Sequence, residues 1–546
     1  MERFCLDNTY DTFEIDSLQS SHPISAKVKH PDEINEIFDR ISYGKGASII
    51  RMMYHFLGEE TFVEGLTAYL NKHKYANAEQ DDLWQSVTEV AHDKGTLIKE
   101  LSVKDIMDTW TLQMGYPVLT VVRDYDNNKF VVKQSRYLTG APNADDLNEY
   151  KWWVPISYDF SGGPFNKTSN SHWLSPAMDE LEIEIPEESK DKALVVNVQQ
   201  TGYFRVTYDS QNWDMIINAL QTDLGSIERT NRGQIFNDLF SLAKSGHVSY
   251  VQVMDSTRYL FKENDYIPWK SGLLGLNYIK SMFRRSAGYG MLKKYLTSEM
   301  MQPYRNLGFV TKKSDSIDDI DLRSEIVNWM CTIGYDDCNR ESLDQFKKWM
   351  QSSNPDKVNP IDPAVRSTIY CEAIAHGDEK EWNFLWNRLK QTSNANERNN
   401  IFRGLSCTNE VWILQRYLEM TIDPTSAIRK QDGTTVIAGI AQNSVGRYMT
   451  WNWLRNSWKE ISTYFDTAIS SAVGKIVLYV TKDFNTPFEL NELEAFYEEH
   501  KNELGTAKRT TQNCIEKVRA NVHWMQNYYS VVYDWLLANV GDDIKI

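Results

Sequence analysis

The sequence predicts a mainly α-helical protein in which a small β-sandwich separates a helical amino-terminal segment from a long α-solenoid. Apolar residues recur with a helical period from about residue 32 to 113, alternate with a period of two from about 117 to 208, and become helical again after Asp209. At 546 residues the chain is too long for one hydrophobic core, because single cores stop growing near about 250–300 residues. We therefore expect domains at 1–114, 115–209 and 210–546.

The first helical segment contains an interruption. One helical face would carry Ile34, Ile37, Phe38 and Ile41, and the next would carry Ile49, Ile50, Met53 and Phe56. Between them stands Ser42-Tyr43-Gly44-Lys45-Gly46. Two glycines inside an amphipathic helix cost roughly 1 kcal/mol each relative to alanine. We therefore expect another group to approach this backbone closely.

The middle segment has the pattern of short antiparallel strands. Val118–Val122 and Phe130–Lys133 flank the turn signal Asp126-Asn127-Asn128, which predicts a hairpin. Further strands are expected at Trp152–Ile156, at Ala193–Val198, and where Leu181, Ile183 and Ile185 alternate with Glu180, Glu182 and Glu184. A small all-β sandwich of about 100 residues or fewer fits this pattern.

The rest of the chain consists of short helical patterns separated by polar breaks. Its first apolar faces carry Trp213, Ile216, Ile217 and Leu220, then Ile235, Leu239 and Leu242. A run of over roughly 300 residues without strand patterns predicts an α-solenoid of stacked helix pairs. No repeat of fixed period is visible, so we expect degenerate repeats.

Composition excludes two classes of partner. The formal net charge of −16, without a dense Lys/Arg stripe, argues against a nucleic-acid partner. The longest apolar stretch, Ala468–Val480, is broken by Lys475 and is shorter than the roughly 18 residues that a membrane span needs. The first residues lack a basic start followed by an apolar core, so we expect any signal or membrane anchor to lie upstream.

Common catalytic motifs are missing from the sequence. None of the 10 histidines has a second histidine four residues away, and no Cys-x-x-Cys pair occurs. Nor is there a Gly-x-Ser-x-Gly elbow, a Walker loop or a dinucleotide fingerprint. Spacing alone therefore predicts no active site, and an isolated helical tyrosine such as Tyr43 is ordinarily structural.

Several segments resemble one known family. They are Asp16–Ile24 (DSLQSSHPI), Ile37–Met52 (IFDRISYGKGASIIRM), Trp110–Pro117 (WTLQMGYP), Gln200–Asp209 (QTGYFRVTYD), Arg366–Gly377 (RSTIYCEAIAHG) and Asn409–Leu414 (NEVWIL). Together they are similar to the aminopeptidase N family, the M1 gluzincin zinc aminopeptidases, over essentially the whole chain. The resemblance implies the helical end of a thermolysin-like catalytic domain, then the β-sandwich. A solenoid of the HEAT and armadillo kind would follow, like the carboxy-terminal domain of the endoplasmic reticulum aminopeptidase.

The resemblance also implies a function, the release of amino-terminal residues from peptides with zinc as cofactor. In the family, the tyrosine of the Ser-Tyr-x-Lys-Gly-Ala segment donates a hydrogen bond to the oxyanion of the tetrahedral intermediate, and here that residue is Tyr43. The family's Gly-x-Met-Glu-Asn anchor, His-Glu-x-x-His pair and third zinc ligand would precede the first residue of this chain. We therefore expect no metal ligands in the chain and no activity from it alone, and an incomplete gene model or clone is the expected explanation.

Six cysteines allow 15 complete pairings, so counting predicts no connectivity. The resemblance implies two disulfides, Cys331 with Cys338 and Cys371 with Cys407, and leaves Cys5 and Cys514 without assigned partners. Disulfides persist in oxidising compartments, and the glycosylation sequon at Asn166 agrees with secretion. We expect the full-length protein at the extracellular face of the plasma membrane or in the secretory pathway.

A second class of function remains open. The chain is alternatively a non-catalytic paralogue whose helical solenoid binds peptides or another protein. The retained Tyr43 segment favours the enzyme, and an upstream reading frame that encodes the anchor and zinc motifs would distinguish the two. The resemblance also implies a homodimer through the helical domain. Substrate preference stays open between neutral, alanine-type residues and acidic residues.

Overall fold

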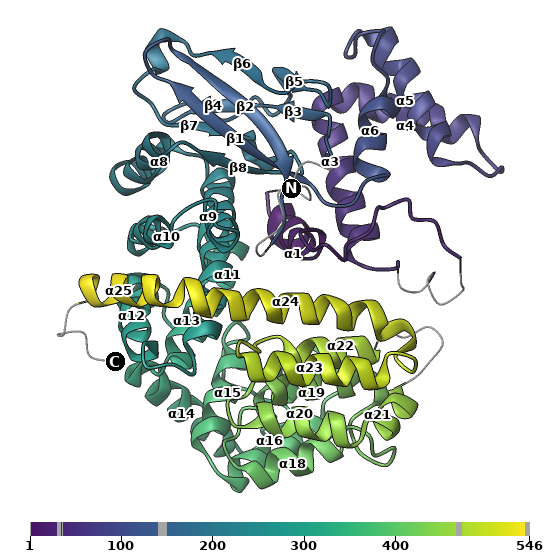
Figure 1. Ribbon diagram of the computed structural model, residues 1–546. Coiled ribbons are helices and arrows are strands. Elements are labelled where there is room, and N and C mark those ends of the chain that lie inside the picture. Colours follow the sequence, from purple (N-terminus) through teal and green to yellow (C-terminus); the bar gives the residue numbers. More distant parts are fainter. Residues whose placement is uncertain (1, 30–33, 35–36, 140–149, 466–471, 541–546) are drawn as a thin grey trace. The chain divides into compact units, whose positions relative to one another are not determined.

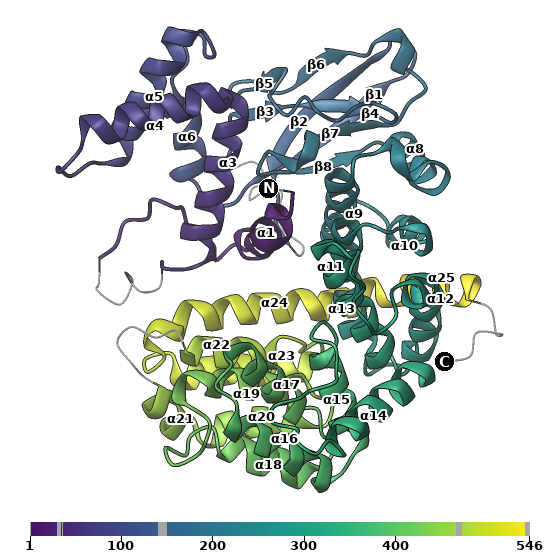
Figure 2. The same ribbon diagram turned by 180° about the vertical axis from the view of Figure 1, so that it is seen from behind.

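The computed structural model describes residues 2–29, 34, 37–139, 150–465 and 472–540 (Figures 1 and 2). The chain forms two compact units. The first comprises Met1–Tyr259 and Lys270–Gly275, and the second comprises Leu260–Trp269 and Leu276–Ile546. The predicted fold class, mainly helical with small sheets and a long helical domain, is confirmed. The predicted divisions at residues 114 and 209 stay a prediction.

The first unit begins with short helices that lead into a helical hairpin. They are η1 (Cys5–Thr9), α1 (Tyr10–Asp16), η2 (Ile41–Lys45), α3 (Gly46–Leu57), α4 (Glu59–Lys72), α5 (Gln80–Lys94) and α6 (Val103–Thr111), where η denotes a π- or 3-10 helix. α5 ends at Gly95, whose φ of 68° suits a residue without a Cβ. α6 begins with a capping box between Ser102 and Asp105.

One of the two predicted apolar faces in this region is wrong. Ile49, Met53 and Phe56 are buried along α3, as predicted, whereas Ile50, predicted on the same face, is 45% exposed. Of the earlier face, Ile41 is buried, whereas Ile34 is 47% exposed. Residues 37–39 form a turn and a bend, and Phe38 is 64% exposed. The reason is that the side chain of Asp39 accepts the next backbone N–H groups and so begins a new helix.

The predicted hairpin forms as β1 (Pro117–Asp124) and β2 (Lys129–Arg136), with Asp124 paired to Lys129 across the turn. The four-stranded sheet has the order β6-β2-β1-β8, in which β8 is parallel to β1. Two smaller sheets pair β3 with β5 and β4 with β7. These strands are β3 (Val154–Ile156), β4 (Tyr158–Phe160), β5 (His172–Leu174), β6 (Leu181–Glu184), β7 (Leu194–Val196) and β8 (Arg205–Tyr208).

The large and small sheets pack through aromatic side chains. The ring of Phe130 in β2 meets that of Tyr158 in β4 edge to face, with centroids 5.1 Å apart. Further along the chain, the first unit adds helices beside the strands. They are η3 (Glu187–Ser189), η4 (Val198–Gln200), α8 (Ser210–Thr222), η5 (Leu224–Ser226), α9 (Arg229–Lys244) and α10 (Tyr250–Thr257). η6 (Leu260–Lys262) and α11 (Tyr266–Phe283) follow.

The second unit is a solenoid of helix pairs. One row of helices pack on one another in turn: α13 (Ile317–Thr332), α15 (Arg366–His376), α17 (Ala395–Leu405), α19 (Lys430–Gln442), α22 (Ala472–Thr481) and α24 (Lys508–Asn527). The intervening helices are α14 (Asp336–Met350), α16 (Glu379–Gln391), α18 (Val411–Glu419), α20 (Gly446–Asn456), α21 (Trp458–Phe465) and α23 (Pro487–His500). η7 (Gly505–Ala507) precedes α24.

Two helices of this unit that lie far apart in the sequence contact each other. α25 (Tyr529–Asn539) packs on α12 (Tyr289–Leu307), where the rings of Tyr295 and Trp535 meet edge to face at 5.1 Å. The hydroxyl of Tyr529 accepts the backbone N–H of Gly288 just before α12. The row of helices therefore closes on itself within the second unit.

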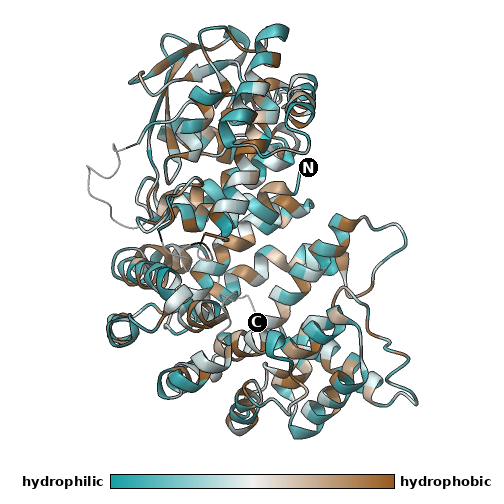
Figure 3. Cartoon of the chain, turned by 90° about the vertical axis from the view of Figure 1, so that its right-hand side faces the viewer, coloured by the Kyte–Doolittle hydropathy of each residue, from teal (hydrophilic) through white to brown (hydrophobic). Residues whose placement is uncertain are grey.

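Apolar and polar residues alternate along the helices (Figure 3). In the part of the chain that the structure describes, no helix is long and apolar enough to cross a membrane. The first residues of the apolar stretch from Ala468, up to residue 471, lie outside that part, and α22 begins at Ala472.

Candidate functional site

Tyr43 is the third residue of the π-helical turn η2. Its side chain is 64% exposed, and its nearest aromatic neighbour is the equally exposed Phe38, with ring centroids 6.3 Å apart. The phenol is therefore accessible on the first unit, whereas the backbone that carries it is packed against buried groups.

The glycine after Tyr43 lets η2 touch the first helices of the chain. A Cβ on Gly44 would lie 2.1 Å from the Oγ1 of Thr12 in α1, so an alanine would clash there. Asn8 Nδ2 also donates to the Gly44 carbonyl oxygen at 2.9 Å. The close approach expected from the sequence thus occurs at Gly44. It does not occur at Gly46, since no described atom lies within 4 Å of the Cβ that this residue lacks.

A buried ion pair anchors the end of the same turn. Lys45 Nζ lies 3.1 Å from Asp16 Oδ2, and both side chains are 0% exposed. The lysine also donates to the carbonyl oxygens of Gly115 at 2.8 Å and Gln113 at 3.1 Å. Burial lowers the pKa of Lys45, and the carboxylate of Asp16 opposes that shift. Sequence patterns did not single out this pair, although both residues lie inside the segments that resemble the family.

The start of the turn is held by a carboxylate and an imidazole. Asp39 Oδ1 accepts the backbone N–H groups of Ile41 at 2.8 Å and Ser42 at 3.1 Å. The other oxygen, Oδ2, lies 2.9 Å from Nε2 of His22, which is 5% exposed. Neither residue was predicted as part of the site, because His22 has no second histidine four residues away in the sequence.

Helix α3 continues from η2 and forms hydrogen bonds with a strained segment that precedes β8. Arg51 donates to the carbonyl oxygens of Gln200 at 2.7 Å and Gln199 at 3.3 Å. Both glutamines have positive φ, 51° at Gln199 and 47° at Gln200. The thiol of Cys5 donates to the same Gln200 carbonyl at 3.6 Å, and burial raises the pKa of this thiol. Cys5 is a free, buried cysteine.

Four cysteines of the second unit lie in two disulfides, Cys331–Cys338 and Cys371–Cys407. The first joins α13 to α14, and the second joins α15 to the segment after α17. Cys514 in α24 is free and buried, and burial raises its pKa to about 11.

The sequon residue Asn166 lies exposed in the loop between β4 and β5. Thr168, the third residue of the sequon, shares a hydrogen bond of 3.1 Å with Nδ1 of His55 in α3. Burial lowers the pKa of His55 to about 4, with a smaller contribution from the charge of Arg51.

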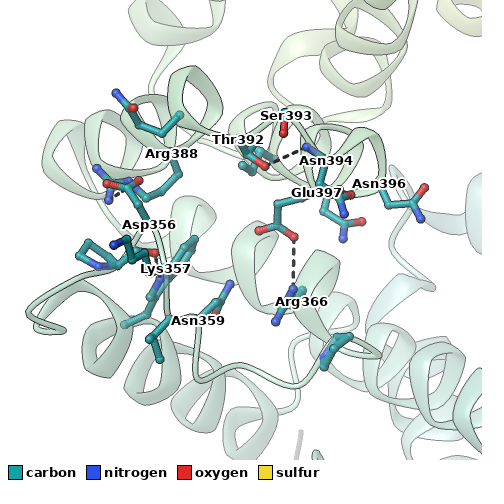
Figure 4. Close-up of a pocket in the computed structure, with 17 residues that line it drawn as sticks. Asp356, Lys357, Asn359, Arg366, Arg388, Thr392, Ser393, Asn394, Asn396 and Glu397 are labelled. Atoms are coloured by element: carbon teal, nitrogen blue, oxygen red, sulfur yellow. Dashed lines mark hydrogen bonds and ion pairs between the residues drawn. The ribbon is translucent and has the colours of Figure 1, made fainter.

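The second unit has an open polar cavity of about 930 Å³ between the segment after α14 and the ends of α16 and α17. Figure 4 shows Arg366 pointing toward Glu397, at 3.6 Å, and Asp356 beside Arg388, at 2.8 Å. These four charges form two pairs of opposite sign. The cavity is lined mainly by polar and charged side chains.

No group of three or more His, Cys, Asp or Glu side chains among the described residues could hold a metal ion. The zinc that the resemblance implies does not fit these residues, because a catalytic zinc needs three protein ligands. The predicted catalytic residue that these residues include is Tyr43, and its role stays a prediction.

Comparison with known proteins agrees with these features. Residues 1–110 match the peptidase family M1 domain, and residues 193–520 match the ERAP1-like C-terminal domain. Aminopeptidase N is 36% identical in Rattus norvegicus, over 98% of this chain and 55% of the relative, and 36% identical in Bos taurus, over 97% and 54%. The thyrotropin-releasing hormone-degrading ectoenzyme of Homo sapiens is 30% identical over 98% of this chain and 50% of its own length. The chain spans about half the length of these relatives. It belongs to the M1 family of aminopeptidases.

Proposed function

We propose that this chain is part of a zinc aminopeptidase that releases single residues from the amino termini of peptides, with Tyr43 as the oxyanion donor. The observation that supports this role is the exposed phenol on a turn whose backbone is held by buried polar groups. When water adds to a scissile carbonyl, the oxygen gains negative charge, and a hydroxyl fixed in advance can donate to it. One such donor is worth roughly 3–4 kcal/mol of barrier.

The chain alone is proposed to be inactive. In the family, zinc supplies the activated water and the Lewis acid, and a hydroxyl donor replaces neither. Since the described residues offer no set of metal ligands, this part of the protein would need residues beyond those described to hold zinc.

The test compares the purified chain with the longest natural product that contains it, using an alanyl arylamide as substrate. We expect zinc-dependent release of alanine from the longer product and none from the chain. In the longer product, Tyr43→Phe should lower kcat by about 10²- to 10³-fold with little change in KM. Tyr75→Phe is the matched control, because Tyr75 is also in the first unit and is fully exposed at a helix end. Full activity of Tyr43→Phe would contradict the proposal.

A longer product that binds zinc but releases nothing, or the lack of any longer product, would favour the alternative. In that case the protein would be a non-catalytic member of the family whose helical domain binds peptides or another protein. Binding of peptides to the wild-type chain, measured by calorimetry, would then support the alternative directly.

We also propose that the protein works in the secretory pathway or at the outer face of the plasma membrane. Two disulfides and the exposed Asn166 support this location, because disulfides persist in oxidising compartments. One of the relatives is itself named an ectoenzyme. Enzymatic deglycosylation of the natural protein should lower its mass, and Asn166→Gln should remove that difference. A protein of unmodified mass with free thiols at all four positions would contradict the location.

Two further expectations concern the domains of the chain and its assembly. We propose a division into domains at 1–114, 115–209 and 210–546, and a homodimer that forms through the helical domain. Limited proteolysis should then release stable fragments with ends near residues 114 and 209. Sedimentation equilibrium of the whole chain should give twice the monomer mass, and a monomer at micromolar concentration would contradict the dimer.

A further inference from the structure

The turn that carries Tyr43 begins at Asp39, and this residue holds three successive backbone N–H groups. Its side chain accepts from Ile41 and Ser42, and its main-chain oxygen accepts from Tyr43 at 3.2 Å. A helix start leaves its first N–H groups without helical partners, so the residue that accepts them sets where the helix begins and which way it points. The direction of the phenol is therefore linked to the position of Asp39.

Asp39 itself is held by His22. The Nε2 atom of the ring lies 2.9 Å from Asp39 Oδ2, while Nδ1 lies 2.8 Å from the carbonyl oxygen of Pro23. A carbonyl and a carboxylate both accept hydrogen bonds, so both ring nitrogens face acceptors. A neutral ring has one N–H and satisfies one of them, whereas the protonated ring donates to both. A charged donor also gives the shorter and stronger hydrogen bond to a carboxylate.

Other charged groups around this pair already have partners. Asp16 accepts the hydroxyl of Ser21, the residue before His22, at 2.7 Å, and its charge is paired with Lys45. Arg40, next to Asp39, pairs with Asp11 of α1 at 3.3 Å, with both side chains more than half exposed. Among the residues that the structure describes, the imidazole of His22 is the side chain that contacts the second oxygen of Asp39, and the two side chains are 6% and 28% exposed.

We propose that His22 is a positioning residue for Tyr43. Its ring holds Asp39, and Asp39 starts the turn that presents the phenol to the substrate carbonyl. This inference rests on the proposed role of Tyr43 for its effect on catalysis. The link from His22 through Asp39 to the turn is independent of that role.

The first test uses the chain itself and hydrogen exchange measured by mass spectrometry. In His22→Ala, exchange in a peptide that covers residues 38–47 should speed up by about tenfold, the factor expected for one lost hydrogen bond of ordinary strength. A peptide from residues 50–57 should be unchanged. His22→Gln should restore slow exchange, because its amide nitrogen can occupy the place of Nε2. Arg40→Ala is the matched control and should exchange like the wild type.

The second test uses the longest product with peptidase activity. His22→Ala should lower kcat by about tenfold while KM and the melting temperature stay near wild type, and His22→Gln should recover most of kcat. Unchanged exchange in residues 38–47 of His22→Ala would overturn the inference, whatever the activity. Full activity of Tyr43→Phe, with faster exchange in His22→Ala, would instead refute the proposed function and leave the structural link intact.

Discussion

Lys45 and Asp16 form an ion pair of 3.1 Å between two side chains that are both fully buried. Removal of one charge from such a pair leaves the other without compensation in a medium of low dielectric constant, which typically costs about 3–5 kcal/mol. We expect Lys45→Met and Asp16→Asn each to destabilise the first unit by this amount. The double variant should cost much less than the sum of the two.

Urea denaturation of the four proteins, followed by hydrogen exchange in α3, measures this coupling. The cycle reports the coupling between the two side chains, because the other hydrogen bonds that each side chain makes are also lost in the single variants. If the single variants unfold at the same urea midpoint as the wild type, water reaches the ion pair, and the pair does not anchor the turn.

Gly44 and Gly46 provide a matched pair of substitutions on either side of Lys45. Gly44→Ala places a Cβ 2.1 Å from Thr12 Oγ1, so we expect a loss of about 1–3 kcal/mol through forced separation of η2 from α1. Gly46→Ala meets open space at the start of α3 and should gain roughly 0.5–1 kcal/mol. Thermal unfolding of both variants checks the signs. Equal effects of the two substitutions would mean that contact with Thr12 does not limit the turn.

The two disulfides should differ in their contribution to stability because they close loops of different length. Cys371 and Cys407 are 36 residues apart, and Cys331 and Cys338 are 7 apart. In the chain-entropy model these separations correspond to about 4 and about 2 kcal/mol respectively. Serine pairs at each site, compared by urea unfolding of the second unit, measure the difference. A larger loss from the shorter loop would indicate that packing around the sulfurs outweighs chain entropy.

Burial raises the pKa of Glu372 to about 7, and His376, with Nδ1 at 3.7 Å, partly opposes this shift. The unfolded chain ionises Glu372 near pH 4.5, whereas the folded chain keeps the proton until about pH 7. The unfolded state therefore binds fewer protons between these values, and stability should fall as pH rises from about 4.5 to about 7. The loss at higher pH is on the order of 3 kcal/mol.

Glu372→Gln removes this ionisation and should raise the melting temperature of the second unit at pH 8 more than at pH 5. Glu379→Gln is the control, because that side chain is 52% exposed. A difference between Glu372→Gln and wild type that is the same at both pH values would show that the carboxyl is already ionised at pH 5.

The periodicity of apolar residues predicted correctly those strands and helices that bury one face. The hairpin from Pro117 to Arg136 forms with the predicted turn, and alternation in β6 matches its burial. The predicted helical face with Phe38 failed because a single side chain, that of Asp39, can begin a new helix and override the spacing of apolar residues. Hydrogen bonds of this kind leave no periodic signal.

Periodicity predicted none of the residues of the candidate site. Tyr43 was predicted from the resemblance to the family, since one exposed tyrosine on a helical turn has no distinguishing pattern. The groups that hold its backbone are Asp16 and Lys45, which have opposite charges and are 29 positions apart in the sequence. Many unrelated pairs in a chain of this size share that description, so the sequence does not single out this pair. Only the fold brings them within 3.1 Å of each other.

The contact between α25 and α12 gives the second unit a property that open solenoids lack. An open array can gain or lose a repeat at either end, because each repeat depends on its neighbours alone. Here α12 and α25 cover each other at the two ends of the row, so the number of helices between them is set by the need for the ends to meet. Insertions are tolerated in the connecting loops, whereas a deleted or duplicated helix pair would separate Tyr295 from Trp535 and expose both ends at once.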